Sequence, residues 1–154
     1  MSLDIDIQQA SSLLNTRVLR LNKLAVRCDI APSFGGGGEK GRRRHFSLRD
    51  VCRLGLAVWL SNAGLRAPAI RDVLRRQAIR SLLSGLNNRR DVETEAKRRR
   101  FLVAAGFHGS TPAFREVKLV GSPKQVGLIL REESGISVPI GMLLASLAVH
   151  LESW

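Results

Sequence analysis

The sequence contains no tyrosine, and only 5% of its residues are aromatic. Proteins that read single-stranded RNA stack its bases on exposed aromatic side chains, so this composition argues against such a surface. Acidic residues are also scarce, since 13 Asp and Glu stand against 25 Lys and Arg and leave a formal net charge of +12. This excess favours a polyanionic partner, because each phosphate that a cation neutralises releases condensed counterions.

Cysteine and histidine are too few and too dispersed to predict a metal site. Cys28 and Cys52 do not form a C-x-x-C pair, which excludes a disulfide scaffold and a cysteine-rich zinc site. His45, His108 and His150 have no partner ligands at metal-binding spacing. We therefore predict no metal ion and no other cofactor, and we interpret Cys28 as an idle thiol rather than a redox sensor and Cys52 as a core residue.

Long hydrophobic runs are absent as well. No apolar run approaches the ~18 residues that a membrane-spanning helix requires. The N-terminus carries Asp4 and Asp6 where a secretory signal needs a basic region followed by an apolar one. We therefore expect a cytoplasmic protein with no membrane partner. The 44% of hydrophobic residues in a chain of 154 predicts a globular protein of one domain or two small ones.

The positive charge is concentrated in the first part of the chain. Residues 1–80 contain 15 basic and 6 acidic residues, a net +9, whereas residues 81–154 contain 10 and 7, a net +3. Because charge distribution bears on partners, the N-terminal part is the predicted polyanion-binding region. A basic surface that serves only solubility is the alternative.

Hydrophobic periodicity predicts two helices near the N-terminus. The first covers residues 5–14, and the second, which is basic, covers residues 18–25 with Asn15 and Thr16 as candidates for its N-cap. The four glycines at 35–38 predict a loop tip. They do not fit a phosphate-binding Walker loop, which needs Gly-Lys-Ser/Thr leading into a helix.

The strongest helix signal follows this loop. Ser47 is a good N-cap for a helix that should end near Asn62, where an Ala-Gly pair follows. Pro68 suits the first turn of another basic helix, whose apolar stripe continues to Ala78. The polar, charged segment 87–100 is interpreted as a solvated linker with at most a helical turn or two.

The periodicity changes beyond this segment. Short runs rich in Val, Phe and Leu predict three strands, at 101–107, 115–120 and 125–131, in a small antiparallel sheet. The last of these strands should be buried, because it is apolar at consecutive positions. Residues 140–151 then form an amphipathic helix that is apolar nearly all round and needs two packing surfaces.

Two motifs in the basic part resemble the MerR-like winged-helix family. The run from Arg43 to Ser47 is similar to the family's Arg-aromatic-Ser/Thr exit from the wing, and Leu19-Arg20 is similar to the Leu-Arg pair of its recognition helix. The resemblance spans roughly residues 5–80 and implies a helix-turn-helix, a two-stranded wing and two further helices. The expected fold is therefore α+β, with a MerR-like winged helix at 4–84, a polar basic linker at 85–100, and a small sheet with a C-terminal amphipathic helix at 101–154.

This resemblance implies where DNA would be contacted. In a winged helix, the second helix of the helix-turn-helix enters the major groove, and arginines at the wing clamp phosphates or enter the minor groove. A solvated helix face and a self-repelling basic loop are the ordinary alternatives. The predicted DNA-binding residues are Arg17, Arg20, Lys23, Arg42, Arg43, Arg44 and His45.

The second packing surface of the C-terminal helix is interpreted as a partner subunit. The predicted dimerisation residues are Leu143, Leu144, Leu147 and Leu151. No set of Ser, His and acidic residues predicts a catalytic site, and the carboxylates Asp91, Glu93 and Glu95 are interpreted as solvated ion pairs.

These observations predict a DNA-binding transcriptional regulator and not an enzyme. Its partners would be double-stranded DNA and a second copy of the chain, with an effector that the sequence does not identify. An excisionase-like or architectural protein that bends DNA for a mobile element is the nearest alternative. A basic RNA-associated protein is a further one, although the shortage of aromatic residues disfavours it.

Overall fold

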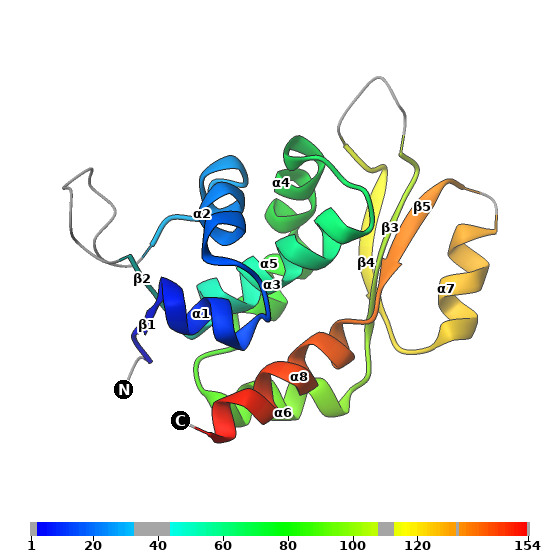
Figure 1. Cartoon of the computed structure of the whole chain (residues 1–154). Helices are drawn as coiled ribbons and strands as arrows, with labels where there is room; N and C mark the ends of the chain where they lie inside the picture. The colour runs from blue at the N-terminus through cyan, green and yellow to red at the C-terminus, as the bar shows by residue number, and fades with distance from the viewer. Residues whose placement is uncertain (1–2, 33–43, 108–112, 132, 154) are drawn as a thin grey trace.

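The computed structural model describes residues 3–32, 44–107, 113–131 and 133–153. Over these residues the chain has the predicted α+β fold, and it contains two small antiparallel sheets (Figure 1). The elements of the first half are β1 (Ile5–Asp6), α1 (Ile7–Leu13), α2 (Val18–Arg27), β2 (His45–Phe46), α3 (Leu48–Asn62), α4 (Ala67–Arg75) and α5 (Gln77–Ser84). Those of the second half are α6 (Arg89–Lys97), β3 (Phe101–Ala105), β4 (Glu116–Val120), α7 (Pro123–Leu130), β5 (Gly135–Val138) and α8 (Ile140–Glu152).

The prediction of a helix over residues 5–14 is wrong at its start. Ile5 and Asp6 form β1, which pairs antiparallel with β2, and the paired side chains of Ile5 and Phe46 are both fully buried. The helix begins after Asp6 because this residue and Gln9 form a capping box, in which each side chain accepts a 2.8 Å hydrogen bond from the other residue's backbone N–H. The strand pair thereby ties the start of the chain to the residues that precede α3.

The turn between α1 and α2 uses the two residues predicted to cap α2. The cap prediction is wrong, because the N-cap residue is Arg17 and no described side chain caps this helix end. Asn15 has a left-handed backbone with φ 45°, and the Thr16 hydroxyl donates a 2.9 Å hydrogen bond to the carbonyl of Leu14. Both residues therefore form the tight turn that sets α2 against α1.

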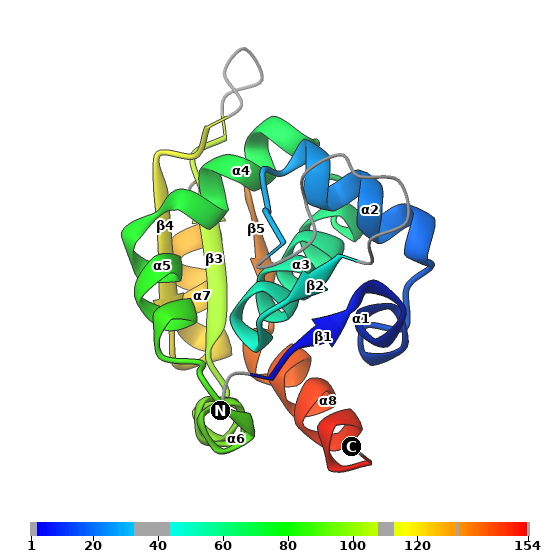
Figure 2. The same cartoon turned by 90° about the vertical axis from the view of Figure 1, so that its left-hand side faces the viewer.

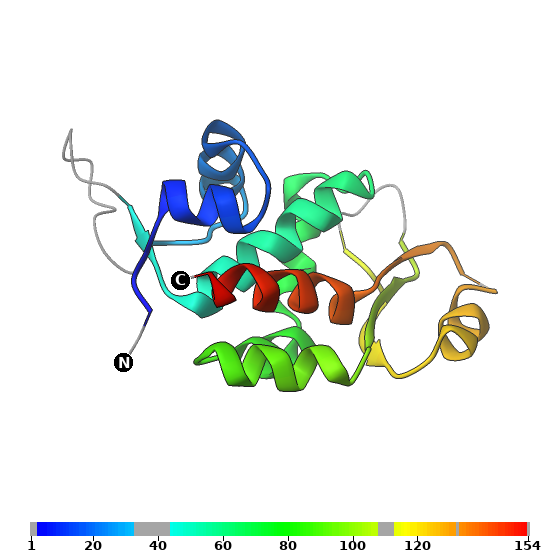
Figure 3. The same ribbon diagram turned by 60° about the horizontal axis from the view of Figure 1, so that its bottom comes forward.

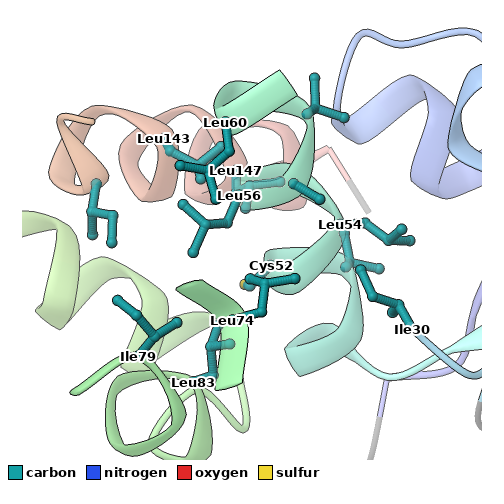
Figure 4. Close-up of a cluster of buried hydrophobic side chains, with 14 of the residues drawn as sticks. Ile30, Cys52, Leu54, Leu56, Leu60, Leu74, Ile79, Leu83, Leu143 and Leu147 are labelled. Atoms are coloured by element: carbon teal, nitrogen blue, oxygen red, sulfur yellow. The ribbon is translucent and has the colours of Figure 1, made fainter. Parts of the chain in front are cut away.

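The helix α3 is the centre of the core, and its predicted limits are confirmed. Ser47 is the N-cap and accepts a 3.2 Å hydrogen bond from the backbone N–H of Asp50, while Gly64, with φ 95°, follows the last turn. Figure 4 shows side chains of α3 among buried residues that come from α4, α5 and α8. They include Leu54, Leu56, Leu60, Leu74, Ile79, Leu83, Leu143 and Leu147.

The apolar stripe that follows Pro68 belongs to two helices rather than one. Pro68 lies in the first turn of α4, as predicted, but Arg76 has an extended backbone with ψ 142° and separates α4 from α5. Its guanidinium donates hydrogen bonds to the carboxylate of Asp72 and to the backbone carbonyl of Phe114. Arg76 is therefore half-buried at a corner between the helices and the sheet, and not on an outer face.

The interpretation of residues 87–100 as a solvated linker is wrong. Most of the segment forms α6, which packs beside α8 (Figure 3). Val92 is fully buried, and Glu95 is only 8% exposed because its carboxylate forms ion pairs with Arg98 and Arg100. A single cluster of buried residues includes side chains from both predicted domains, so the described part of the chain has one continuous core.

The predicted three-stranded sheet is present, but one of its strands is elsewhere in the chain. The first two predicted strands are confirmed as β3 and β4, and the third is β5, so that the order is β4-β3-β5 with both pairings antiparallel. Residues 125–131 were assigned to a buried strand, and this assignment is wrong because they lie largely in α7. Ser122 caps α7 and Pro123 begins it, a start signal that outweighs the apolar run. Figures 1 and 2 show α7 on the face of the sheet opposite the other helices.

The C-terminal helix is confirmed as α8, but its predicted dimerisation residues are not available to a partner. Leu143, Leu144, Leu147 and Leu151 are all buried by this chain's own helices, with exposed fractions of 5%, 2%, 1% and 5%. The large apolar side chains that α8 leaves in solvent are instead Met142 and Val149. Within the described ranges, none of the helices combines the length and apolar character needed to cross a bilayer.

Candidate nucleic-acid interface

The helix α2 presents a basic face to solvent. It contains no acidic residue, and its buried side is formed by Leu21, Leu24 and Ala25. Arg17 at the N-cap and Lys23, six residues later, are both exposed, as the sequence predicts. The helix α2 is therefore half-buried, and its exposed cations form no ion pair with the described residues.

Two large apolar side chains share that exposed face. Leu19 is 66% exposed and Val26 is 68% exposed, although neither is needed to cover the core. Their spacing of seven residues places them on one side of the helix, with Lys23 between them. A face that combines cations with exposed aliphatic groups can meet both phosphates and the apolar edge of a base.

The third predicted residue of α2 is held by a neighbouring helix. The Arg20 guanidinium donates a 2.6 Å hydrogen bond to Oδ1 of Asn62, in the last turn of α3, and lies 3.5 Å from the hydroxyl of Ser61. Asn62 marks the end of α3 in the sequence, but nothing there indicates a partnership with Arg20, from which it is separated by 42 residues. The structure therefore adds Asn62 to the candidate site as a positioning residue.

The predicted wing residues are only partly described. Arg42 and Arg43 lie outside the described residues. Arg44 is half-buried, and its side chain donates a 3.3 Å hydrogen bond to Oδ1 of Asn22 on α2. His45 lies in β2, and its Nδ1 is 3.1 Å from a carboxylate oxygen of Asp4. Arg44 and His45 are thus fixed to α2 and to the N-terminal segment, respectively.

The backbone supports this connection between β2 and the helix pair. The N–H of Ile7, the first residue of α1, donates a 3.1 Å hydrogen bond to the carbonyl of Arg44. Together with the Arg44–Asn22 contact, this bond places one arginine against both α1 and α2. The sequence predicts Arg44 as a cation of the site, but it does not predict Asn22 as its acceptor.

The remaining polar clusters of the described residues consist largely of ion pairs and helix caps. The predicted solvated ion pair is present for Glu93, which pairs with Arg89. Asp91 instead accepts backbone N–H hydrogen bonds in the capping box of α6, and Glu95 pairs with Arg98 and Arg100 but is buried. No group of three potential metal ligands occurs among the described residues. A groove of about 640 Å³ between α5, α6 and β4 contains side chains of both charge signs.

The two cysteines are buried thiols. Burial raises the pKa of the Cys52 thiol to about 12, and the nearby carboxylate of Asp50 adds to this effect. Burial also raises the pKa of Cys28, against which the positive charge of Arg71 acts. Because the reactive species is the thiolate, both environments disfavour redox or metal-sensing chemistry.

Comparison of the chain with models of known protein families finds no match, and comparison with curated protein sequences finds none either.

Proposed function

We propose that this chain is a MerR-like winged-helix protein that binds duplex DNA and regulates transcription. One observation carries the proposal: α2 contains no acidic residue and presents Arg17, Arg20 and Lys23 to solvent, where none of the three pairs with a carboxylate of the described residues. A helix of ordinary solubility would combine both charge signs on its exposed face. A cytoplasmic location would accompany this role.

The order of elements supports the same proposal. A short strand, two helices joined by a tight turn, a connection that includes Arg42 and Arg43, and a second strand paired with the first precede the long α3. The two helices and their tight turn match the expected helix-turn-helix, whereas the one described strand that follows them, β2, pairs with β1 and not with a second wing strand. The Arg44 and His45 side chains would continue the wing's phosphate or minor-groove contacts toward α2.

The side chains of α2 suit distinct contacts in the major groove. Arg20 can read the O6 and N7 acceptors of guanine while Asn62 fixes the direction of its guanidinium. Arg17, at the uncapped start of the helix, and Lys23 would bind phosphates. Leu19 and Val26 are placed to contact thymine methyl groups.

Fluorescence anisotropy of a labelled duplex, measured over a range of salt concentrations, tests this proposal. Arg17→Gln/Lys23→Gln should weaken binding and reduce the slope of log affinity against log salt by up to about 2, since each phosphate contact contributes about 0.9. The matched control is Arg90→Gln/Lys97→Gln, which removes the same charge from exposed positions on α6. Equal effects of the two variants would overturn the role of α2.

The architectural alternative differs in selectivity rather than in the contacts of α2. A protein that bends DNA without reading it would show the same salt dependence but little preference among duplex sequences.

The homodimer also stays a prediction, and any interface must use a surface other than the four buried leucines of α8. Sedimentation at micromolar concentration separates a dimer from a monomer.

A further inference from the structure

A second concentration of positive charge lies beside α2, on residues that the sequence does not single out for DNA. Two grooves meet there, one of about 290 Å³ and one of about 170 Å³, and both are lined by Arg53 and Arg80. Figure 2 shows the elements involved, with α2, α4 and α5 around α3. The arginines that line the joined grooves are Arg49, Arg53, Arg71, Arg75 and Arg80. We name these five residues the arginine groove.

Carboxylates neutralise only part of this charge. Asp29 pairs with Arg75 at 3.3 Å, and Asp50 lies 3.6 Å from Arg53. Within the described part of the chain, the guanidinium groups of Arg71 and Arg80 form neither an ion pair nor a hydrogen bond. Five guanidinium groups therefore face two carboxylates, and two of the five have all their donors available.

The lining of the groove distinguishes between classes of anionic ligand. Apart from the arginines, it consists mostly of short polar side chains, with Cys28 and Leu74 as the apolar contributions and no aromatic residue. A nucleotide or a drug-sized anion needs an enclosed apolar wall or a stacking ring, which this lining lacks. Repeated guanidinium groups along an open groove instead match the evenly spaced phosphates of a nucleic-acid backbone.

The groove is continuous with the candidate interface on α2. Cys28 is the C-cap residue of α2, and both Cys28 and Asp29 line the smaller groove together with Arg71 and Arg75. The charged surface therefore runs from the C-terminal end of α2 across α4 and α3 to α5. The arginine groove therefore extends beyond the exposed face of α2 that is proposed to contact bases.

We propose that the arginine groove binds the phosphate backbone of the DNA that flanks the site read by α2. This inference rests on the proposed function, because the flank is that of the same duplex. The groove makes no selective contact with bases, since guanidinium groups that meet phosphates carry no sequence information. Contact with the arginine groove lengthens the DNA segment that the protein covers. It also requires the flanking DNA to follow the side of the protein.

Duplexes of about 12 and about 30 base pairs, which are shorter and longer than a single domain's footprint, test this proposal by anisotropy at several salt concentrations. Arg71→Gln/Arg80→Gln removes the two arginines that have no partner, so it orphans no carboxylate. We expect this variant to bind the short duplex like wild type. On the long duplex its salt slope should fall by up to about 2, with a loss of affinity of tenfold or more at moderate salt.

The variants Arg17→Gln/Lys23→Gln and Arg90→Gln/Lys97→Gln complete the experiment, and circular dichroism verifies that each remains folded. A groove variant that matches the α6 control on both duplexes overturns the groove while leaving α2 in place. Loss of binding by the groove variant alone, with the α2 variant unaffected, overturns the proposed function and the flank proposal that depends on it. Absence of duplex binding by wild type overturns both.

Discussion

Arg20 of α2 and Asn62 of α3 are joined by a 2.6 Å hydrogen bond from the guanidinium Nη2 to the amide Oδ1. Both side chains are exposed, so the bond adds little to the stability of the fold. It uses one donor of a group that has five and directs the others. In the proposed DNA-binding role, this bond would orient the Arg20 guanidinium before DNA arrives.

Asn62→Ala should weaken DNA binding without unfolding the protein. The variant releases Arg20, and ordering the side chain on binding then costs about 1 kcal/mol, which corresponds to about fivefold in affinity. Anisotropy with a duplex that contains a preferred site measures this change, and Arg20→Gln should abolish the additional effect of Asn62→Ala. An Asn62→Ala protein with wild-type affinity would contradict the positioning role.

The corner between α4, α5 and the sheet should be a stability determinant. Asp72 accepts a 2.9 Å hydrogen bond from Arg76 and a 3.1 Å hydrogen bond from the backbone N–H of Phe114. Asp72→Ala removes both acceptors at a half-buried position, so we expect a loss of about 2 kcal/mol in the free energy of unfolding. For a chain of this length, this loss lowers Tm by roughly 4 to 8 °C in a thermal melt.

An exposed aspartate–arginine pair supplies the control for this variant. Asp29 and Arg75 lie 3.3 Å apart, with side chains that are 73% and 69% exposed. Asp29→Asn removes the charge but keeps a side chain that tolerates the left-handed backbone of this residue (φ 60°), so it should change the free energy of unfolding by about 0.5 kcal/mol or less, because water screens such pairs. Equal destabilisation by Asp29→Asn and Asp72→Ala would show that the corner has no special role.

The packing of α8 on the end of α6 depends on a glycine. A Cβ atom on Gly141 would lie 2.8 Å from Cα of Arg99 and 3.2 Å from the carbonyl oxygen of Ala96. Gly141→Ala therefore forces the two helices apart, and we expect a destabilisation of about 1 to 3 kcal/mol in urea unfolding. Gly127→Ala on α7 meets no atom within 4 Å and should stabilise by about 0.5 to 1 kcal/mol. A Gly141→Ala protein that is more stable than the Gly127→Ala protein would contradict this packing.

The stability should decrease at alkaline pH through Cys52. Its pKa is about 12 in the folded chain, above the ordinary value of 9.0, because burial disfavours the thiolate. Below pH 9 the thiol is protonated in both the folded and the unfolded chain, so its contribution to the free energy of unfolding is fully present. As the pH rises from 9 toward 12, the unfolded chain ionises first, so the folded state loses up to about 1.4 kcal/mol per pH unit from this group.

Urea unfolding between pH 8 and pH 11 measures this effect, for which the absence of tyrosine removes one competing titration. Cys52→Ala should start from a lower stability and show a shallower decline with pH. An unchanged decline would show that other groups, such as the lysines, control the alkaline transition. Wild-type thiols should also react with a disulfide reagent at pH 8 only after unfolding.

The sequence predicts those parts of the fold that depend on local signals. The cap at Ser47, the glycine that follows Asn62 and the proline of α4 act within one or two turns of the chain, so the helices α3 and α4 start where the sequence indicates. The stripe of α8 is likewise a local pattern. In each case the tertiary contacts agree with the local preference.

The errors arise where a distant contact decides the structure. Ile5 is a strand residue because it pairs with Phe46, and the apolar stripe breaks at Arg76 because of bonds to Asp72 and Phe114. The apolar run of α7 resembles a buried strand because short runs do not distinguish the two states by periodicity. Its overlooked signal is Ser122, whose hydroxyl accepts a hydrogen bond from the N–H three residues later.

The candidate site was predictable in its cations but not in their partners. Arg17, Arg20 and Lys23 follow from helical periodicity within one segment. Asn62 and the arginine groove could not be predicted, because they depend on how α3, α4 and α5 pack around α2. The four leucines of α8 illustrate the converse, since an apolar stripe does not indicate whether the covering surface belongs to the same chain.

Selection from a pool of duplexes with a randomised central segment tests the central claim most directly. We expect the wild-type chain to enrich a defined site, with guanine at a position that Arg20→Gln no longer selects, while Arg90→Gln/Lys97→Gln enriches the wild-type site. A pool that remains random after repeated rounds with the folded wild-type chain would contradict sequence reading by α2.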